Sequence, residues 1–148
     1  MYDDILVPTD GSDMVSVALD HALSIAGDND ATIHALSVVD TRITAAANDE
    51  GRAELRETLE SECDEAVAAV VDAASSAGIE AVSEVRYTTP WKGILEYAET
   101  ASIDLIVIGT HGKSPLEKRT SMGSVSERVV DNAEIPVLVV RRSSQDGA

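Results

Sequence analysis

The fold is decided by the stretch DLIVIGTHGKSPLEKRTSMGSVSE, which spans residues 104–127. Its first part, Asp104–Ile108, ends in an apolar run of the kind that forms a buried strand in a parallel sheet. A polar loop with several glycines follows, and a helical pattern begins at Ser124. Glycine lets a backbone approach a ligand closely, and a helix N-terminus presents N–H groups without partners. We therefore expect a strand, a loop and a helix start that together cradle an anion, and we interpret this anion as the phosphates of a nucleotide.

Strand and helix patterns alternate along the rest of the chain. Apolar runs bounded by turn residues indicate strands, and apolar residues spaced three and four apart indicate helices. The expected strands are Ile5–Val7, Thr32–Val39, Ile79–Tyr87, Asp104–Ile108 and Pro136–Arg141. The expected helices run from the Asp10–Ser12 turn to about Ala26, from about Gly51 to Ala77, from Thr89 and Pro90 onward, and from Ser124 to about Ala133. Residues 27–30 are expected to stop the first helix, and Asp40–Asp49 is expected to be a loop.

This alternation predicts an α/β fold: one open, doubly wound sheet of five parallel strands with helices on both faces. We expect the strand order 3-2-1-4-5, with the polar third strand at one edge. Ligands of such sheets bind at the C-terminal strand ends, where the strand order reverses. In this order the turn after the first strand and the loop after Gly109 meet at the reversal. We expect one domain over residues 1–142 and a flexible tail over residues 143–148.

Composition narrows the function. The chain has 148 residues, a net charge of −16 and 44% hydrophobic residues, which fits a globular protein with an acidic surface, as in halophilic cells. Such a charge argues against nucleic-acid binding. The N-terminus is acidic, unlike a signal peptide, and no apolar run reaches membrane-spanning length, so we expect a cytoplasmic protein. Cys63 is the only cysteine and falls on the apolar face of a helical pattern, where a small core residue is expected.

The negative charge is not evenly spread. Residues 111–128 contain Lys113, Lys118, Arg119 and Arg128 against Glu117 and Glu127, so this segment carries +2 and the rest of the chain −18. A positive island in an acidic protein is where an anionic ligand would bind. A chance cluster of solvated charges is the alternative interpretation.

Three related nucleotide and phosphate folds fail on specific residues. Gly112-Lys113-Ser114 looks like the end of a P-loop, but that motif requires a glycine where Val107 stands. The turn after the first strand lacks the glycine fingerprint of dinucleotide-binding folds. A response-regulator receiver domain needs an aspartate near the end of the third strand and a lysine near the end of the fifth. Tyr87–Thr89 and Arg141-Arg142 stand there instead.

An ordered set of motifs resembles the ATP-binding class of the universal stress protein family. These motifs are ILVPTDGS from Ile5, SVVD from Ser37, GTHG from Gly109, GSVSE from Gly123 and PVLVV from Pro136. Together they cover about residues 2–142. One departure concerns the loop Lys113–Met122, which has ten residues where the family usually has nine, and which contains Pro115. A loop absorbs one extra residue at little entropic cost.

The resemblance implies a site for ATP, together with Mg²⁺, in which most contacts come from the backbone. Asp10 would bind the ribose or lie beside the base, and Val38 would offer backbone groups to the adenine edge. The glycine loop would bind phosphates through its N–H groups, and the following helix start would hold the outer phosphates. The implied contact residues are Pro8, Thr9, Asp10, Val38, Gly109, His111, Gly112, Gly123, Ser124, Val125 and Ser126.

These residues also allow simpler interpretations. Asp10 is suited to an N-cap, Ser124 and Glu127 to a capping box, and Gly109 and Gly112 to a tight turn. No catalytic base and no metal-ligating cluster is recognised in the sequence, so binding is favoured over turnover.

The function implied by the resemblance is that of a nucleotide-responsive regulator in the stress response. It also implies a homodimer that pairs through the last strand, Val137–Val140, which we expect at a sheet edge. A slow ATPase or phosphotransferase is one alternative. A dimeric interaction module without nucleotide is the other.

Overall fold

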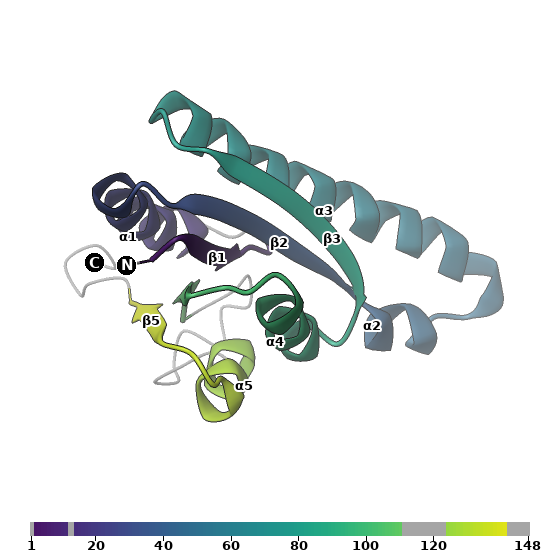
Figure 1. Ribbon diagram of the computed structural model, residues 1–148. Helices are drawn as coiled ribbons and strands as arrows, with labels where there is room; N and C mark the ends of the chain where they lie inside the picture. The colour runs from purple at the N-terminus through teal and green to yellow at the C-terminus, as the bar shows by residue number, and fades with distance from the viewer. Residues whose placement is uncertain (1, 12–13, 111–123, 142–148) are drawn as a thin grey trace.

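A single sheet of five parallel strands, in the order β3-β2-β1-β4-β5, organises the protein (Figure 1). The computed structural model describes residues 2–11, 14–110 and 124–141. The strands are β1 Asp4–Pro8, β2 Thr32–Asp40, β3 Ala81–Thr88, β4 Leu105–Gly109 and β5 Val137–Val140. The helices are α1 Met14–Asn29, α2 Thr41–Ala46, α3 Asp49–Ser76, α4 Pro90–Thr100 and α5 Ser124–Asn132. The predicted fold class and strand order are confirmed.

Helices cover both faces of the sheet, as the alternation predicts (Figure 1). The α1 and α3 side chains pack on one face and those of α4 and α5 on the other. Strand β4 shows why the central strands are apolar throughout. Its residues Leu105 and Val107 belong to the α1/α3 core, whereas Ile106 and Ile108 belong to the α4/α5 core. A strand buried on both faces has no polar side to present, so alternation of apolar and polar residues disappears.

Glycines in the sequence predict where α1 and α3 end. The helix α1 continues through Gly27 to Asn29, past the expected last residue Ala26, and ends within the predicted stop at residues 27–30. The helix ends where Asp30 adopts a φ of 55°, a left-handed conformation that aspartate tolerates better than most residues. At the end of α3, Gly78 has a φ of +75°, in agreement with its predicted place just beyond the helix.

The expected loop at Asp40–Asp49 is wrong, because it contains the six-residue helix α2. Asp40 caps this helix by accepting a hydrogen bond from the backbone N–H of Arg42 at 3.0 Å. Asn48 then caps α3 by accepting from the N–H of Gly51 at 2.8 Å. A helix of fewer than two turns carries no readable period, so only its caps could reveal it. Thr89, expected to cap α4, has the extended backbone of a cap but makes no capping hydrogen bond through its side chain.

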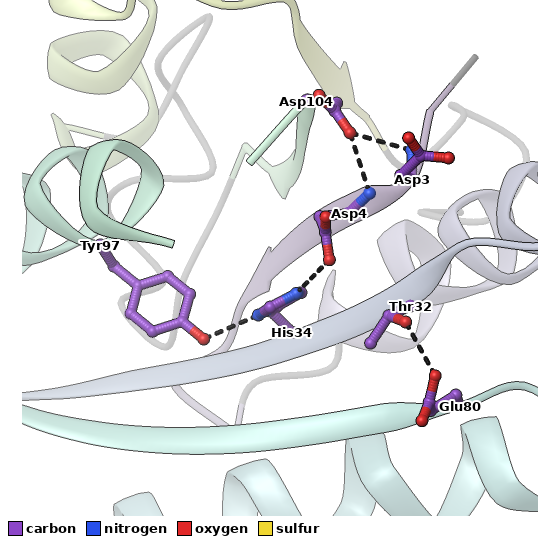
Figure 2. Close-up of polar contacts among 7 residues, drawn as sticks. All are labelled: Asp3, Asp4, Thr32, His34, Glu80, Tyr97 and Asp104. Carbon is purple, nitrogen blue, oxygen red and sulfur yellow. Dashed lines mark hydrogen bonds and ion pairs between the residues drawn. The ribbon is translucent and has the colours of Figure 1, made fainter. Parts of the chain in front are cut away.

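A chain of polar contacts fixes α4 to the N-terminal half of the sheet (Figure 2). His34 on β2 lies between two partners: its Nε2 is 2.9 Å from Asp4 Oδ1 and its Nδ1 is 2.7 Å from the Tyr97 hydroxyl. A neutral imidazole with its proton on Nε2 satisfies both, donating to the carboxylate and accepting from the hydroxyl. Burial raises the pKa of Tyr97, so its hydroxyl keeps the proton that it donates. Asp104 extends the chain by accepting the backbone N–H of Asp4 at 3.0 Å.

The two sheet edges are β3 and β5, as predicted, because each has one neighbouring strand in the sheet. Strand β3 carries polar and exposed residues, including an ion pair between Arg86 Nε and Glu84 Oε2 at 2.8 Å. Strand β5 is short and apolar, and Val137, Leu138 and Val139 are only half-buried. None of the described helices combines the length and the apolar character that crossing a bilayer requires.

Replacing each of two helical glycines by alanine should change the stability of the protein in opposite directions. A Cβ at Gly93 in α4 would lie 2.9 Å from Thr88 Cγ2 and 3.0 Å from Val38 Cγ2, whereas a Cβ at Gly27 would meet no described atom within 4 Å. We expect Gly27→Ala to raise the free energy of unfolding by about 0.5–1 kcal/mol through helix propensity. Gly93→Ala should lower it by about 1–2 kcal/mol through overpacking. Urea denaturation measures both values, and a stabilising Gly93→Ala would contradict the close approach of α4 to β2.

Candidate functional site

The two central strands part at their C-terminal ends. Strands β1 and β4 pair only at Ile5–Leu105 and Leu6–Ile106. Beyond this point β1 stays with β2, and the N–H of Thr9 donates to the Leu36 carbonyl at 2.8 Å. The point at which β1 and β4 stop pairing, hereafter the opening, lies at the reversal of strand order, where doubly wound sheets bind ligands.

Strand β4 departs to the other side in the same way. The N–H of Thr110 donates to the Val140 carbonyl at 3.1 Å, so β4 continues along β5 rather than along β1. Two predicted site residues, Pro8 and Gly109, end the two parting strands. The predicted meeting of the turn after β1 and the segment after β4 at one edge of the sheet therefore follows from backbone hydrogen bonding.

The turn after β1 presents Asp10. Thr9 is buried, and its Oγ1 accepts a hydrogen bond from the N–H of Gly11 at 3.2 Å, which holds the turn closed. Gly11 has a φ of +81°, a conformation that no helical residue adopts. Gly11 is therefore not helical, and the first residue of α1 that the structure describes is Met14, so the N-cap interpretation of Asp10 stays a prediction. The Asp10 side chain is exposed at the edge of the opening.

Val38 lies on the part of β2 that extends beyond β1. The β1–β2 register ends at Pro8–Leu36, and in a parallel ladder the backbone groups of alternate residues face the same neighbour. Because Leu36 faces β1, the N–H and carbonyl of Val38 face the same side, past the last residue of β1. The Val38 side chain is half-buried and packs on the α4/α5 core. Gly93 permits this packing and was not identified from the sequence.

The helix start on the opposite side is formed by the first turn of α5. Ser124 is exposed, Val125 is half-buried and Ser126 is buried. Ser124 is the first residue of α5 itself, whereas an N-cap residue stands one position before the first helical residue. Glu127 lies in the first turn. The N-terminal N–H groups of α5 give this turn a partial positive charge. The other predicted residues, His111, Gly112 and Gly123, and the loop Lys113–Met122 lie outside the described residues.

Charged groups near this edge are engaged with neighbours. Arg128, the described basic member of the positive island, has its guanidinium carbon 5.4 Å from the centre of the Trp91 ring, a cation–π contact that joins α5 to α4. Asp40 receives a bidentate contact from Arg42, with Nε to Oδ1 at 3.0 Å and Nη2 to Oδ2 at 2.7 Å. This hydrogen bonding holds the pKa of Asp40 below its ordinary value. Asp40 is therefore a fixed anchor of α2.

One further feature of the site was not predicted from the sequence. Thr110 is buried directly after β4, and among the described residues its hydroxyl has no hydrogen-bond partner. No group of three or more His, Cys, Asp or Glu side chains is arranged to hold a metal ion within residues 2–11, 14–110 and 124–141. What the edge offers chemically is backbone N–H groups, small hydroxyls and one exposed carboxylate.

Comparisons with known proteins agree with this geometry. The model of the universal stress protein family matches residues 1–141. Universal stress protein MJ0531 of Methanocaldococcus jannaschii is 42% identical over 147 residues, which cover 99% of this chain and 86% of the relative. The solved structure of MJ0577 from the same organism has a TM-score of 0.88 at 30% identity and covers 97% of this chain and 99% of its own. A universal stress protein solved in complex with cAMP has a TM-score of 0.67 at 26% identity, covering 96% and 98%.

The Asp40–Arg42 contact gives a pH-dependent prediction. A carboxyl whose pKa is lowered on folding adds stability above its ordinary pKa, near 3.8 here, and loses it as the pH falls through the depressed value. We expect Arg42→Gln to raise the pKa of Asp40 toward its ordinary value and to destabilise the protein at neutral pH but not at the acid end. Carboxyl ¹³C NMR titration and urea denaturation measure the two effects. Arg52→Gln, at the start of α3, is the control and should leave the titration of Asp40 unchanged.

Proposed function

Because this chain belongs to the universal stress protein family, we propose that it is an ATP-binding member that acts as a nucleotide-responsive regulator. The observation that carries the proposal is the parting of β1 and β4. It sets an exposed carboxylate and backbone groups on one side of an opening and a helix N-terminus on the other. In this proposal the nucleoside lies on the β1/β2 side and the phosphates lie on the α5 side.

Each part of a nucleotide has a chemically matched partner at this edge. The backbone of Val38 faces past the end of β1, where a flat base presents alternating donors and acceptors. The exposed carboxylate of Asp10 accepts hydrogen bonds from ribose hydroxyls. The first turn of α5, from Ser124 to Ser126, supplies N–H groups and a partial positive charge to phosphate oxygens. Gly109, with no side chain at the end of β4, leaves room for the ligand to approach the backbone.

The solved relative that holds cAMP supports an adenine nucleotide as the ligand class. We favour ATP because the start of α5 lies on the phosphate side and, in the sequence, the glycine loop and most of the positive island directly precede it. A helix terminus contributes about 0.3–1 kcal/mol per charge, whereas micromolar binding requires about 8 kcal/mol, so base, ribose and phosphate contacts must act together. In the absence of a carboxylate cluster among the described residues, Mg²⁺ would arrive bound to the phosphates.

Regulation would follow from changes at the surface around α5 when nucleotide binds. The acidic composition, with a net charge of −16, suits a protein of a salt-rich cytoplasm. The one carboxylate among the proposed contacts, that of Asp10, is assigned to the ribose and not to an attacking water, so the proposal is binding rather than turnover.

Nucleotide binding is tested by titration calorimetry. We expect Mg-ATP to bind with a micromolar Kd and cAMP to bind more weakly, since it presents one phosphate to the α5 side. Gly123→Val should abolish binding because a side chain would stand where the backbone must approach phosphate. Gly27→Ala, on the exposed side of α1, is the control and should bind as the wild type does. Absence of heat with the wild-type protein refutes the proposal, and phosphate release that Ser124→Ala removes would identify a slow ATPase instead.

The edge position of β5 supports a homodimer. Among the described strands β4 is the neighbour of β5, so no described strand pairs with its other side, where a second chain could add. We expect light scattering to give the mass of a dimer and Val139→Lys to shift it to the monomer. Val82→Lys is the matched control, since Val82 is 44% exposed on the opposite edge strand, β3. Equal effects of the two substitutions, or a monomeric wild-type protein, would rule out pairing through β5.

A further inference from the structure

Thr110 carries a buried hydroxyl without a hydrogen-bond partner among the described residues. The residue is 1% exposed, and its Oγ1 is the one buried side-chain polar atom in the described part of the chain for which no partner exists. Most buried hydroxyls are hydrogen-bonded, because burying one without a partner is unfavourable. A ligand that supplies a hydrogen-bond acceptor would explain why the buried Thr110 hydroxyl has no partner among the described residues.

The direction of the Thr110 side chain follows from the ladder. Its N–H donates to the Val140 carbonyl at 3.1 Å, as the N–H of Ile106 donates to the Pro136 carbonyl at 3.0 Å, so Thr110 keeps the orientation of the alternate β4 residues although the chain bends at this position. Side chains alternate between the two faces of a strand. Ile106 and Ile108 belong to the α4/α5 core, and Thr110 is the next residue in that series. Its hydroxyl therefore faces α4 and α5 and not α1.

The first turn of α5 lies on this face. Val125 packs on the α4/α5 core, and Val129, one turn later, is fully buried in it. The N–H groups at the start of a helix need acceptors, and so do hydroxyl donors. An oxyanion at the start of α5 would serve both. Glu127, the acidic residue of the first turn, is exposed and points away from the core.

We propose that Thr110 contacts the nucleotide, donating a hydrogen bond from its hydroxyl to a phosphate oxygen held at the start of α5. The inference rests on the proposed function and adds a residue to it. The Thr110 hydroxyl then has opposite effects on the nucleotide-free and the nucleotide-bound protein. Without nucleotide the hydroxyl destabilises the protein, and with nucleotide it strengthens binding.

Removal of the hydroxyl alone separates these effects. Thr110→Val keeps the shape of the side chain, and Thr110→Ser keeps the hydroxyl. We expect Thr110→Val to raise the Tm of the nucleotide-free protein by about 2–4 °C. It should weaken Mg-ATP binding about tenfold, or about 1.4 kcal/mol. Binding of adenosine, which has no phosphate, should not change. Thr110→Ser should bind Mg-ATP nearly as the wild type does.

A second threonine provides the control. Thr100 is the last residue of α4 and lies toward the N-terminal ends of the strands, opposite the site. Its hydroxyl donates to the Glu96 carbonyl at 2.9 Å. Thr100→Val should leave Mg-ATP affinity unchanged. If the wild type binds Mg-ATP and Thr110→Val binds it equally well, the inference about Thr110 is refuted and the proposed function is not. If the wild type binds no nucleotide, both the proposed function and the inference are refuted.

Discussion

The structure depends on how two neighbouring strands divide their hydrogen bonds. Strands β1 and β4 begin as partners and then separate after Leu6 and Ile106, because each continues along its outer neighbour. Beyond the separation, the sides of β1 and β4 that faced each other no longer pair, so backbone and turn residues of both strands face a common opening. The described residues assigned to the candidate site lie on the segments that leave this point or on β2 and α5, which border it. The position of the site therefore follows from the strand order, and individual side chains determine only its chemistry.

The two ends of the sheet are built for different purposes. At the N-terminal end, Asp4, His34 and Tyr97 satisfy one another in a closed series of contacts that joins β1, β2 and α4. At the C-terminal end the polar groups are backbone amides, an exposed carboxylate and a hydroxyl without a described partner. Satisfied polar networks make an element rigid, whereas a buried hydroxyl without a partner is a group that a ligand can stabilise. The same fold therefore satisfies its polar side chains at one end and leaves the buried Thr110 hydroxyl without a described partner at the other.

Much of this architecture could be predicted from the sequence. Apolar runs on strands buried on both faces gave the sheet, and the glycine at position 78 gave a helix end. Local backbone chemistry accounts for the errors. Within the predicted stop at residues 27–30, α1 passes Gly27 and ends at Asn29, directly before Asp30 with its positive φ. Helix α2 has only six residues and no period. The conformation of Gly11, the fit of Gly93 against Val38 and the burial of the Thr110 hydroxyl depend on three-dimensional neighbours and leave no pattern in the sequence.

The contact between α4 and α5 has an experimental consequence of its own. The chain contains one tryptophan, and its ring lies beneath the guanidinium of Arg128 on the helix whose first turn borders the opening. A nearby cation shifts and quenches indole emission. The protein thus contains an intrinsic fluorophore placed to report displacement of α5, with no background from a second indole.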